Sequence, residues 1–370
     1  MRESSRSGRM DDIMRSLILA LALFAVRLPA HEIQTLASGD DYLAFPAVIE
    51  LGDEVIVSYK RGKSHGADTG ATLDLMRLNK ASGKVFATGT LASVENEIMQ
   101  MGEWVRFTNG DVANYIDAQA AKGSLRTGMA VVRSNDGGKT FGPVQRLGVI
   151  DGVEYGYAFD SITRGPTTWM LVMTFANLTG GKLVHPARSQ PGSVDVIRSE
   201  DNGLTWRLVR SITAELGGAP INESAFMPHG DGFIVTARGY DDRQWLLRTD
   251  AAFQVLQKVD LNAAHDFITS HIGRPRLFAR DGGSYLLGRN WIEKGVMQLA
   301  LFKFDPESLV ITKHTVLDNA DKQHVADGYY AQPYWTEKEG HTRFHVITYK
   351  RGMEKNASIL GMEFEWNAVR

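Results

Sequence analysis

Two eight-residue stretches in the middle of the chain share one pattern: SNDGGKTF at residues 134–141 and SEDNGLTW at residues 199–206. Both read S-x-D-x-G-x-T-aromatic. In such a stretch the Asp carboxylate accepts hydrogen bonds from backbone N–H groups just ahead of it, and a Gly can adopt positive φ. The aromatic side chain then packs into apolar surroundings. Each stretch follows an apolar run typical of a β-strand, at residues 129–133 and 194–198. The pattern therefore predicts a repeated β-hairpin turn and a repeat architecture.

This pattern resembles the Asp-box, or BNR repeat, of the sialidase superfamily. The resemblance implies a β-propeller in which these turns lie on the outer rim and carry no catalytic residue. Degenerate relatives of the pattern begin near residues 79, 249 and 304. Their spacing fits six blades, within the range of about four to eight that propellers commonly have. We therefore expect an all-β fold, a six-bladed β-propeller of four-stranded antiparallel blades, formed as one domain by residues 31–370. The best short helical candidate is residues 114–123.

The first 30 residues have the features of a secretory signal peptide. Arg9 and Arg15 precede an apolar run at residues 17–26, and residues 28–30 resemble a cleavage site. The apolar run is too short to span a bilayer as a helix. We expect a periplasmic or secreted protein without a membrane span once the signal is removed; a retained anchor is the alternative.

The composition excludes several classes of protein. The chain has 370 residues, with 41 Lys and Arg against 43 Asp and Glu. This balance argues against a nucleic-acid partner, which favours a basic surface. The absence of cysteine excludes disulfides, thiolate metal sites and Cys nucleophiles. The histidines lack the spacing of a metal site. We expect no metal, no cofactor and a monomer.

Polar residues at the start of each innermost strand line the central channel of a propeller. The stretches expected to open the six blades are unusually rich in Glu, Arg and Tyr. They begin near Asp41, Gly102, Glu154, Asn222, His271 and Asp327. Because these positions converge from distant parts of the sequence, we expect the functional site among them.

Within this set, the segment from Asn222 to Arg238 resembles the sialidase segment in which a Glu is followed about one hairpin later by an Arg. The resemblance implies that Glu223 activates a Tyr nucleophile from the last blade and that Arg238 binds the substrate carboxylate. Tyr330 matches the nucleophile by its order in the chain. Tyr329 is the alternative, because neighbouring residues of a strand face opposite sides. A phenol with a pKa of about 10 is a poor nucleophile, so a Glu acting as base is the physical requirement.

Three arginines bind the carboxylate in the sialidase family, since a guanidinium group can contact both carboxylate oxygens. Arg238 accounts for one, and Arg274 or Arg276 for another. The resemblance places the first arginine two residues before a proline in blade one, but here Ala44 precedes Pro46. Arg61, in the same blade, is the candidate substitute. The departure puts sialic acid itself in doubt and leaves the superfamily intact. The predicted substrate-binding residues are Arg61, Glu154, Arg238, Arg274, Arg276 and Tyr329.

The acid/base of sialidases is an Asp on a loop after the second strand of the first blade. Asp68 lies in that region. His65 is the alternative, because the ordinary pKa of an imidazole, about 6.5, suits proton transfer at neutral pH. The predicted catalytic residues are therefore Tyr330, Glu223 and either Asp68 or His65.

These residues lead to one main functional hypothesis and two alternatives, each with a glycan as partner. The main hypothesis is an exported, exo-α-sialidase-like glycoside hydrolase that cleaves a terminal acidic sugar with a Tyr/Glu pair. The first alternative is a polysaccharide lyase on a propeller, with His65 and a Tyr as base and acid and an Arg neutralising a uronate. The second is a glycan-binding propeller without catalytic activity, because a fold alone does not determine function.

Overall fold

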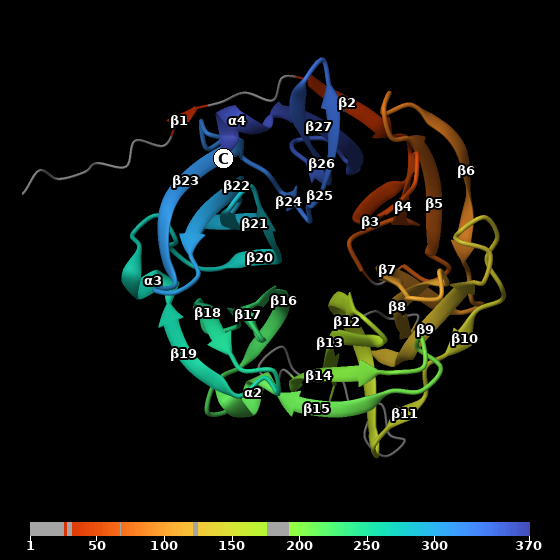
Figure 1. Cartoon of the computed structure of the whole chain (residues 1–370). Coiled ribbons are helices and arrows are strands. Elements are labelled where there is room, and N and C mark those ends of the chain that lie inside the picture. The colour runs from red at the N-terminus through yellow and green to blue at the C-terminus, as the bar shows by residue number, and fades with distance from the viewer. Residues whose placement is uncertain (1–25, 28–31, 67, 121–124, 176–191) are drawn as a thin grey trace, which may run out of the picture.

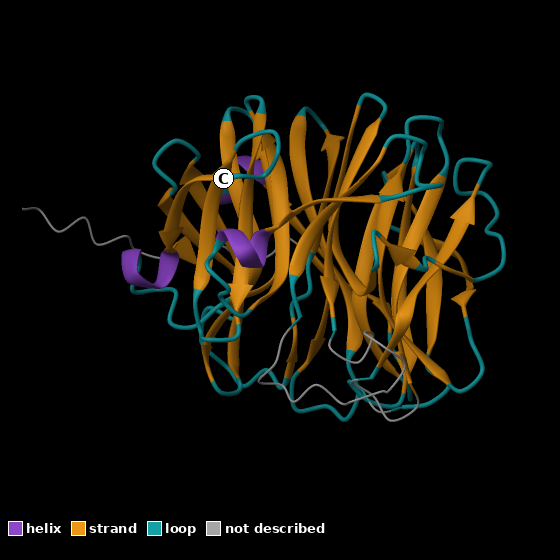
Figure 2. Cartoon of the chain, turned by 90° about the horizontal axis from the view of Figure 1, so that it is seen from below, coloured by secondary structure: helices purple, strands orange, loops and turns teal. Residues whose placement is uncertain are grey.

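The computed structural model describes residues 26–27, 32–66, 68–120, 125–175 and 192–370. Six antiparallel sheets stand in a ring around a central axis (Figure 1). Seen at right angles to that view, the strands run between two faces of a disc and the turns gather at both faces (Figure 2). The expected six-bladed, all-β propeller is thereby confirmed.

The first three blades follow one another along the chain. Blade one contains β3 (Tyr42–Leu51), β4 (Glu54–Gly62), β5 (Thr72–Asn79) and β6 (Val85–Ala92). Blade two contains β7 (Glu97–Arg106), β8 (Val112–Ala120), β9 (Arg126–Ser134) and β10 (Gln145–Arg146). Blade three contains β12 (Val153–Arg164), β13 (Thr167–Thr174), β14 (Val194–Ser199) and β15 (Arg207–Ser211), with β11 (Val149–Ile150) beside β12.

The other three blades complete the ring. Blade four contains β16 (Ile221–His229), β17 (Gly232–Gly239), β18 (Gln244–Thr249) and β19 (Val255–Asp260). Blade five contains β20 (Ile272–Arg280), β21 (Gly283–Glu293), β22 (Val296–Asp305) and β23 (Val310–Asp318). Blade six contains β24 (Asp327–Gly328), β25 (Gln332–Lys338), β26 (His341–Arg351) and β27 (Ser358–Glu365). Three single-turn helices of the described residues lie between or after blades: α2 (Ile212–Glu215), α3 (Leu261–Ala264) and α4 (Trp366–Val369).

Pairing between the two ends of the chain closes the ring. The strand β2 (Glu32–Ala37) runs antiparallel to β27 and becomes the outermost strand of blade six. Figure 1 shows these two strands side by side at the junction of the first and last blades. The short β1 (Val26–Arg27) pairs in parallel with β23. The remainder of the expected signal peptide, residues 1–25 and 28–30, lies outside the described residues. In the described part of the chain, no helix has the length and apolar character needed to cross a membrane.

Local turn chemistry explains the hairpins of the blades. Between β20 and β21, Asp281 and Gly282 have φ values of 47° and 73°. Positive φ at both central residues is typical of the type I′ turn, whose twist matches that of the flanking strands. The pairing of Arg280 with Gly283 then sets the register of the whole hairpin.

The two repeated stretches form the hydrogen-bonded turn that their pattern predicts. Asp136 accepts hydrogen bonds from the backbone N–H of Lys139 and Thr140 at 3.0 and 2.9 Å. In the second stretch, Asp201 accepts from the backbone N–H of Thr205 at 2.9 Å. Both turns lie between the two outer strands of their blades, β9–β10 and β14–β15. They therefore stabilise the rim and lie away from the central channel.

The expected helix at residues 114–123 is wrong within the described residues, because residues 112–120 form β8. The central part of this strand is buried on both faces; Tyr115 and Ile116 are at most 2% exposed. Alanines in the segment favour a helix in isolation. Burial between two neighbouring strands and two neighbouring blades overrides that preference.

Candidate active site

Tyr330 and Glu223 come together from two blades that are separated by blade five. Glu223 lies on β16 of blade four and is 3% exposed, whereas Tyr330 follows β24 of blade six. The hydroxyl of Tyr330 donates a short hydrogen bond to Oε1 of Glu223. The hydroxyl of Tyr329 donates instead to Asp318 at 2.7 Å. The structure thus joins Tyr330 to Glu223 and directs Tyr329 away from it.

Two arginines flank this pair. Nη1 of Arg238, on β17, donates to Oε2 of Glu223 at 2.7 Å. The guanidinium carbon of Arg289, on β21, lies 4.9 Å from the centroid of the Tyr330 ring. The backbone N–H of Arg274 also donates to Oε2 of Glu223, at 2.9 Å. Glu223 therefore accepts hydrogen bonds from three groups and lies within a strongly cationic environment.

Sequence reasoning missed Arg289, although the chain contains a signal for it. In blade four, Gly239 pairs with Ile221, the first residue of β16, and Arg238 comes just before it. In blade five, Asn290 pairs with Ile272, the first residue of β20, and Arg289 comes just before it. The two arginines occupy equivalent positions in consecutive blades, so an alignment of the two hairpins finds the second from the first.

The charges of the site set the protonation states of the pair. Burial raises the pKa of Glu223, but the charges of Arg238 and Arg289 and the hydrogen bond from Tyr330 outweigh burial and lower that pKa to about 2. Burial and the charge of Glu223 raise the pKa of Tyr330 above its usual value, while Arg289 and Arg238 lower it in part. At neutral pH the site therefore contains a carboxylate that accepts a hydrogen bond from a neutral phenol.

This lowered pKa predicts a specific dependence of stability on pH. The ionised form of Glu223 stabilises the folded state above the usual Glu pKa of about 4.5, and this contribution disappears as the pH falls towards about 2. The difference in free energy of unfolding between the wild type and Glu223→Gln should therefore change over this pH interval and stay constant above it. Urea unfolding at a series of pH values measures it. A difference that is the same at pH 5 and pH 2 would contradict the prediction.

His65 reaches the same group of residues from the loop after β4. Its Nδ1 atom lies 2.6 Å from Oδ2 of Asp327, the first residue of β24. The ring of His65 contacts the ring of Phe45 edge-on at 5.0 Å, and Phe45 in turn contacts Tyr330 at 5.3 Å. The side chain of His65 is 60% exposed. The ring is therefore accessible from solvent and lies one aromatic side chain away from Tyr330.

Asp68, the alternative acid/base, lies in the framework of the same loop. Its Oδ1 atom pairs with Nζ of Lys60 at 2.7 Å, and both side chains are buried. Its Oδ2 atom accepts hydrogen bonds from the backbone N–H of Lys63 and Ser64 at 2.8 and 3.3 Å. Both carboxylate oxygens are thus engaged within the loop.

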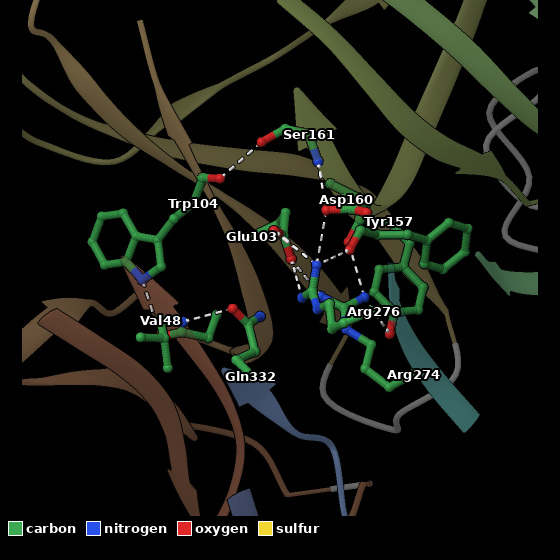
Figure 3. Close-up of polar contacts among 12 residues, drawn as sticks. Val48, Glu103, Trp104, Tyr157, Asp160, Ser161, Arg274, Arg276 and Gln332 are labelled. Atoms are coloured by element: carbon green, nitrogen blue, oxygen red, sulfur yellow. Dashed lines mark hydrogen bonds and ion pairs between the residues drawn. The ribbon is translucent and has the colours of Figure 1, made fainter. Parts of the chain in front are cut away.

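The side chains of Arg274 and Arg276 turn towards blades two and three. Figure 3 shows the carboxylate of Glu103 on β7 beside the guanidinium groups of both arginines. Oε2 of Glu103 accepts from Nη2 of Arg274 at 2.7 Å and from Nη2 of Arg276 at 2.6 Å. Arg276 also pairs with Asp160 at 3.1 Å. Burial raises the pKa of Asp160 to about 6, although the charge of Arg276 opposes this. These two arginines therefore belong to a buried ionic network, and only the backbone of Arg274 contacts Glu223.

The other two predicted substrate-binding residues lie elsewhere. Arg61 pairs with Asp41 at 3.2 Å and with Asp74 of β5 at 2.5 Å. Glu154 lies at the start of β12, with its carboxylate against Gly128 of blade two. Among the hydrogen bonds and ion pairs of the described residues, none links Arg61 or Glu154 to Tyr330 or Glu223. In the same described ranges, no cluster of three or more acidic or His side chains is arranged to hold a metal ion.

The fold is similar to those of several solved proteins. The chain is similar to a protein of unknown function from Dyadobacter fermentans, with a TM-score of 0.70 and 14% identity over 92% of this chain and 99% of that one. It is also similar to the NanB sialidase from Streptococcus pneumoniae, with a TM-score of 0.62 and 10% identity over 91% and 71% of the two chains. The fold is sialidase-like. Phage phi92 endosialidase also matches, with a TM-score of 0.62 and 8% identity over 90% of this chain and 69% of that one.

No family model matches the chain, and neither does any curated protein. Identities this low show the fold alone. Within it, the structure brings Tyr330, Glu223, Arg238 and His65 to one place and adds Arg289 and Asp327.

Proposed function

We propose that this protein is an exported glycoside hydrolase that cleaves a terminal acidic sugar from a glycan, with Tyr330 as nucleophile and Glu223 as its base. The observation that supports this most is the hydrogen bond from the Tyr330 hydroxyl to the buried Glu223 carboxylate. A neutral phenol is a weak nucleophile, and an adjacent base that accepts its proton activates it. Tyr nucleophiles of this kind are the sialidase exception among glycosidases.

The reaction takes two steps, formation and hydrolysis of a glycosyl–Tyr330 intermediate. In the first, the Tyr330 oxygen forms a bond to the anomeric carbon while its proton passes to Glu223, and the glycosidic bond breaks as a proton donor protonates the leaving oxygen. In the second, water attacks the anomeric carbon after losing a proton to the same group, and Tyr330 leaves and recovers its proton from Glu223. The guanidinium of Arg289 over the phenol ring stabilises the negative charge that develops on Tyr330 in both steps.

The cations around Tyr330 support an acidic sugar. The Nε atoms of Arg238 and Arg289 are buried and lack a hydrogen-bond partner among the described residues. Burial of charge is costly unless the charge is paired. Among the described residues, Glu223 is the one ion-pair partner of Arg238, and the carboxylate of Asp327 is 3.9 Å from Arg289. Two guanidinium groups beside Tyr330 would attract a substrate carboxylate to the site, even though Ala44 replaces the arginine expected in blade one.

A panel of aryl glycosides with one shared leaving group tests this function. We expect release of the aryl group from a sialoside or a uronide and little release from the matched neutral glycosides. Cleavage of neutral glycosides at equal rates would contradict the acidic substrate class, and release from none of them would contradict the hydrolase. Recovery of the processed protein from the periplasm or the medium would support export, and its recovery from the cytoplasm would count against export.

A specific observation also favours the polysaccharide lyase as a second candidate. His65 is exposed and held by Asp327, as a base that removes a proton beside a carboxylate has to be, and the two arginines suit a uronate. A lyase leaves an unsaturated product that absorbs ultraviolet light, whereas a hydrolase does not. Binding to glycans without either product would leave the non-catalytic propeller.

A further inference from the structure

Two buried side chains, Lys60 and Gln100, hold the main chain of His65 by hydrogen bonds. Nζ of Lys60, which is fully buried, donates to the carbonyl oxygens of Ser64 and His65 at 3.0 and 3.2 Å. Nε2 of Gln100, from blade two, donates to the same His65 carbonyl at 2.6 Å. A buried ammonium group must be paired and hydrogen-bonded to remain charged. The Lys60–Asp68 ion pair therefore ties the path of this loop to the core, and His65 is exposed only through its side chain.

Asp327 holds the imidazole of His65 through a hydrogen bond to Nδ1. The Asp327 carboxylate is 8% exposed and accepts hydrogen bonds from the hydroxyls of Tyr42 and Tyr349, the latter at 2.7 Å. Burial raises the pKa of Asp327, but His65, the Tyr42 hydroxyl and the charge of Arg289 lower it well below its usual range. An ionised carboxylate only accepts hydrogen bonds, so Nδ1 of His65 carries the proton in this contact. The Nε2 atom is then the one available for chemistry.

We propose that Asp327 is a positioning residue that orients His65, and that Nε2 of His65 is the group that transfers protons to and from the substrate. This proposal rests on the proposed hydrolase function and specifies its proton donor. When the glycosidic bond breaks, its electron pair goes to the leaving oxygen, which takes the proton from Nε2 of the imidazolium. When water attacks the glycosyl–Tyr330 intermediate, the neutral Nε2 takes a proton from that water, and the imidazolium is restored.

Three features of the site favour His65 over Asp68 in this role. Both oxygens of Asp68 are occupied by Lys60 and by backbone N–H groups. The Asp68 side chain is 6% exposed, whereas that of His65 is 60% exposed. The orienting carboxylate, which fixes the tautomer of an imidazole in other catalytic sites, is present for His65. Asp68 then supports the loop that presents His65.

The orientation is tested without any substrate by NMR of protein labelled with 15N-histidine. The signals of His65 are assigned by their loss in His65→Gln. In neutral His65 of the wild type we expect the Nδ1-protonated tautomer, and in Asp327→Asn we expect it to be lost. A wild-type His65 protonated on Nε2, or a tautomer unchanged in Asp327→Asn, would overturn the positioning role.

The proton-transfer role is tested with two substrates that share one acidic sugar. One has a nitrophenyl leaving group, which needs little protonation, and the other has an alkyl leaving group, which needs full protonation. We expect His65→Gln and Asp327→Asn to reduce kcat/KM on the alkyl glycoside by about 10²–10⁴-fold, the usual contribution of general acid catalysis. The loss on the nitrophenyl glycoside should be far smaller. Azide, which attacks the glycosyl intermediate without needing a base, should accelerate turnover of that substrate by His65→Gly.

Asp318→Asn is the matched control, because Asp318 also accepts a hydrogen bond from a Tyr hydroxyl and pairs with Lys350 at 2.8 Å. On each of the two substrates we expect this variant to have the same kcat/KM as the wild type.

Asp327 is buried, so folding of its variant is checked by circular dichroism. The exposed His65→Gln provides the kinetic test if Asp327→Asn does not fold. A leaving-group dependence in Asp68→Asn that is absent in His65→Gln would overturn the assignment. A wild type that cleaves neither substrate would refute the hydrolase and this proton transfer together, while the NMR result still decides the orientation.

Discussion

Replacement of Glu223 by Gln is expected to lower kcat on an acidic aryl glycoside by about 10²–10⁴-fold, since the amide cannot accept the proton of Tyr330. Gln preserves the size of the side chain and one acceptor oxygen, so the fold and the binding of substrate should change little. Tyr330→Phe removes the nucleophilic oxygen itself and should cause a loss at least as large. Steady-state kinetics at saturating substrate measure both effects. Under this condition the rate reports kcat, so a change in KM cannot cause the decrease.

Tyr155→Phe provides the control for this prediction. The hydroxyl of Tyr155 donates to Asp195 at 3.0 Å, so the variant also loses a buried hydrogen bond from a Tyr to a carboxylate, but in blade three and away from Glu223. We expect its kcat to remain close to that of the wild type. Full activity of Glu223→Gln or of Tyr330→Phe would remove the proposed nucleophile pair.

The second large effect is on stability and concerns Glu103. This carboxylate is shared by the guanidinium groups of Arg274 and Arg276, and all three side chains are at most 7% exposed. Glu103→Ala would leave two buried cations with Asp160 as their remaining carboxylate partner in the described network. Loss of one partner of a buried ion pair typically costs about 3–5 kcal/mol. We expect a decrease of this size in the free energy of unfolding, measured by denaturant titration.

A surface ion pair supplies the comparison. Glu54 pairs with Arg77 at 2.8 Å, and the Glu54 side chain is 40% exposed. Glu54→Ala should cost no more than about 1 kcal/mol, as is usual for exposed pairs. Similar losses in the two variants would show that the network around Glu103 is not the buried ionic core that its geometry indicates. Because the backbone N–H of Arg274 contacts Glu223, Glu103→Ala should also lower activity.

The sequence predicts the blades well because their signals are local. The turns at Asp136 and Asp201 are built from residues within one short stretch, and the type I′ turn at Asp281 and Gly282 is likewise set by two adjacent residues. The pairing of Tyr330 with Glu223 is long-range and was accessible only through the order of blades that the resemblance supplied. Geometry alone distinguishes Tyr330 from Tyr329.

The direction of the Arg274 and Arg276 side chains has a physical cause that the sequence does not show. The inner strands of blades one and five are irregular, with register shifts between Ala44 and Ala47 and between Gly273 and Arg276. Non-glycine residues there adopt positive φ, 56° at Phe45 and 43° at Arg274. Alternation of side chains along a strand fails at such points, so the sequence could not show that Arg274 and Arg276 turn towards Glu103. Backbone strain of this kind is concentrated at functional sites.

The closure of the ring has a consequence for how activity is acquired. Tyr42, Phe45 and His65 belong to blade one, whereas their partners Asp327, Tyr349 and Tyr330 belong to blade six, and Tyr42 and Asp327 are 285 positions apart. The antiparallel pairing of β2 with β27 joins the two ends of the chain beside these contacts. A chain in which β2 has not yet paired with β27 would keep most of its strand content by circular dichroism, and we expect it to lack the proposed activity. The proposed activity would therefore report when β2 pairs with β27 during folding. A single proteolytic cut that frees β2 should abolish that activity.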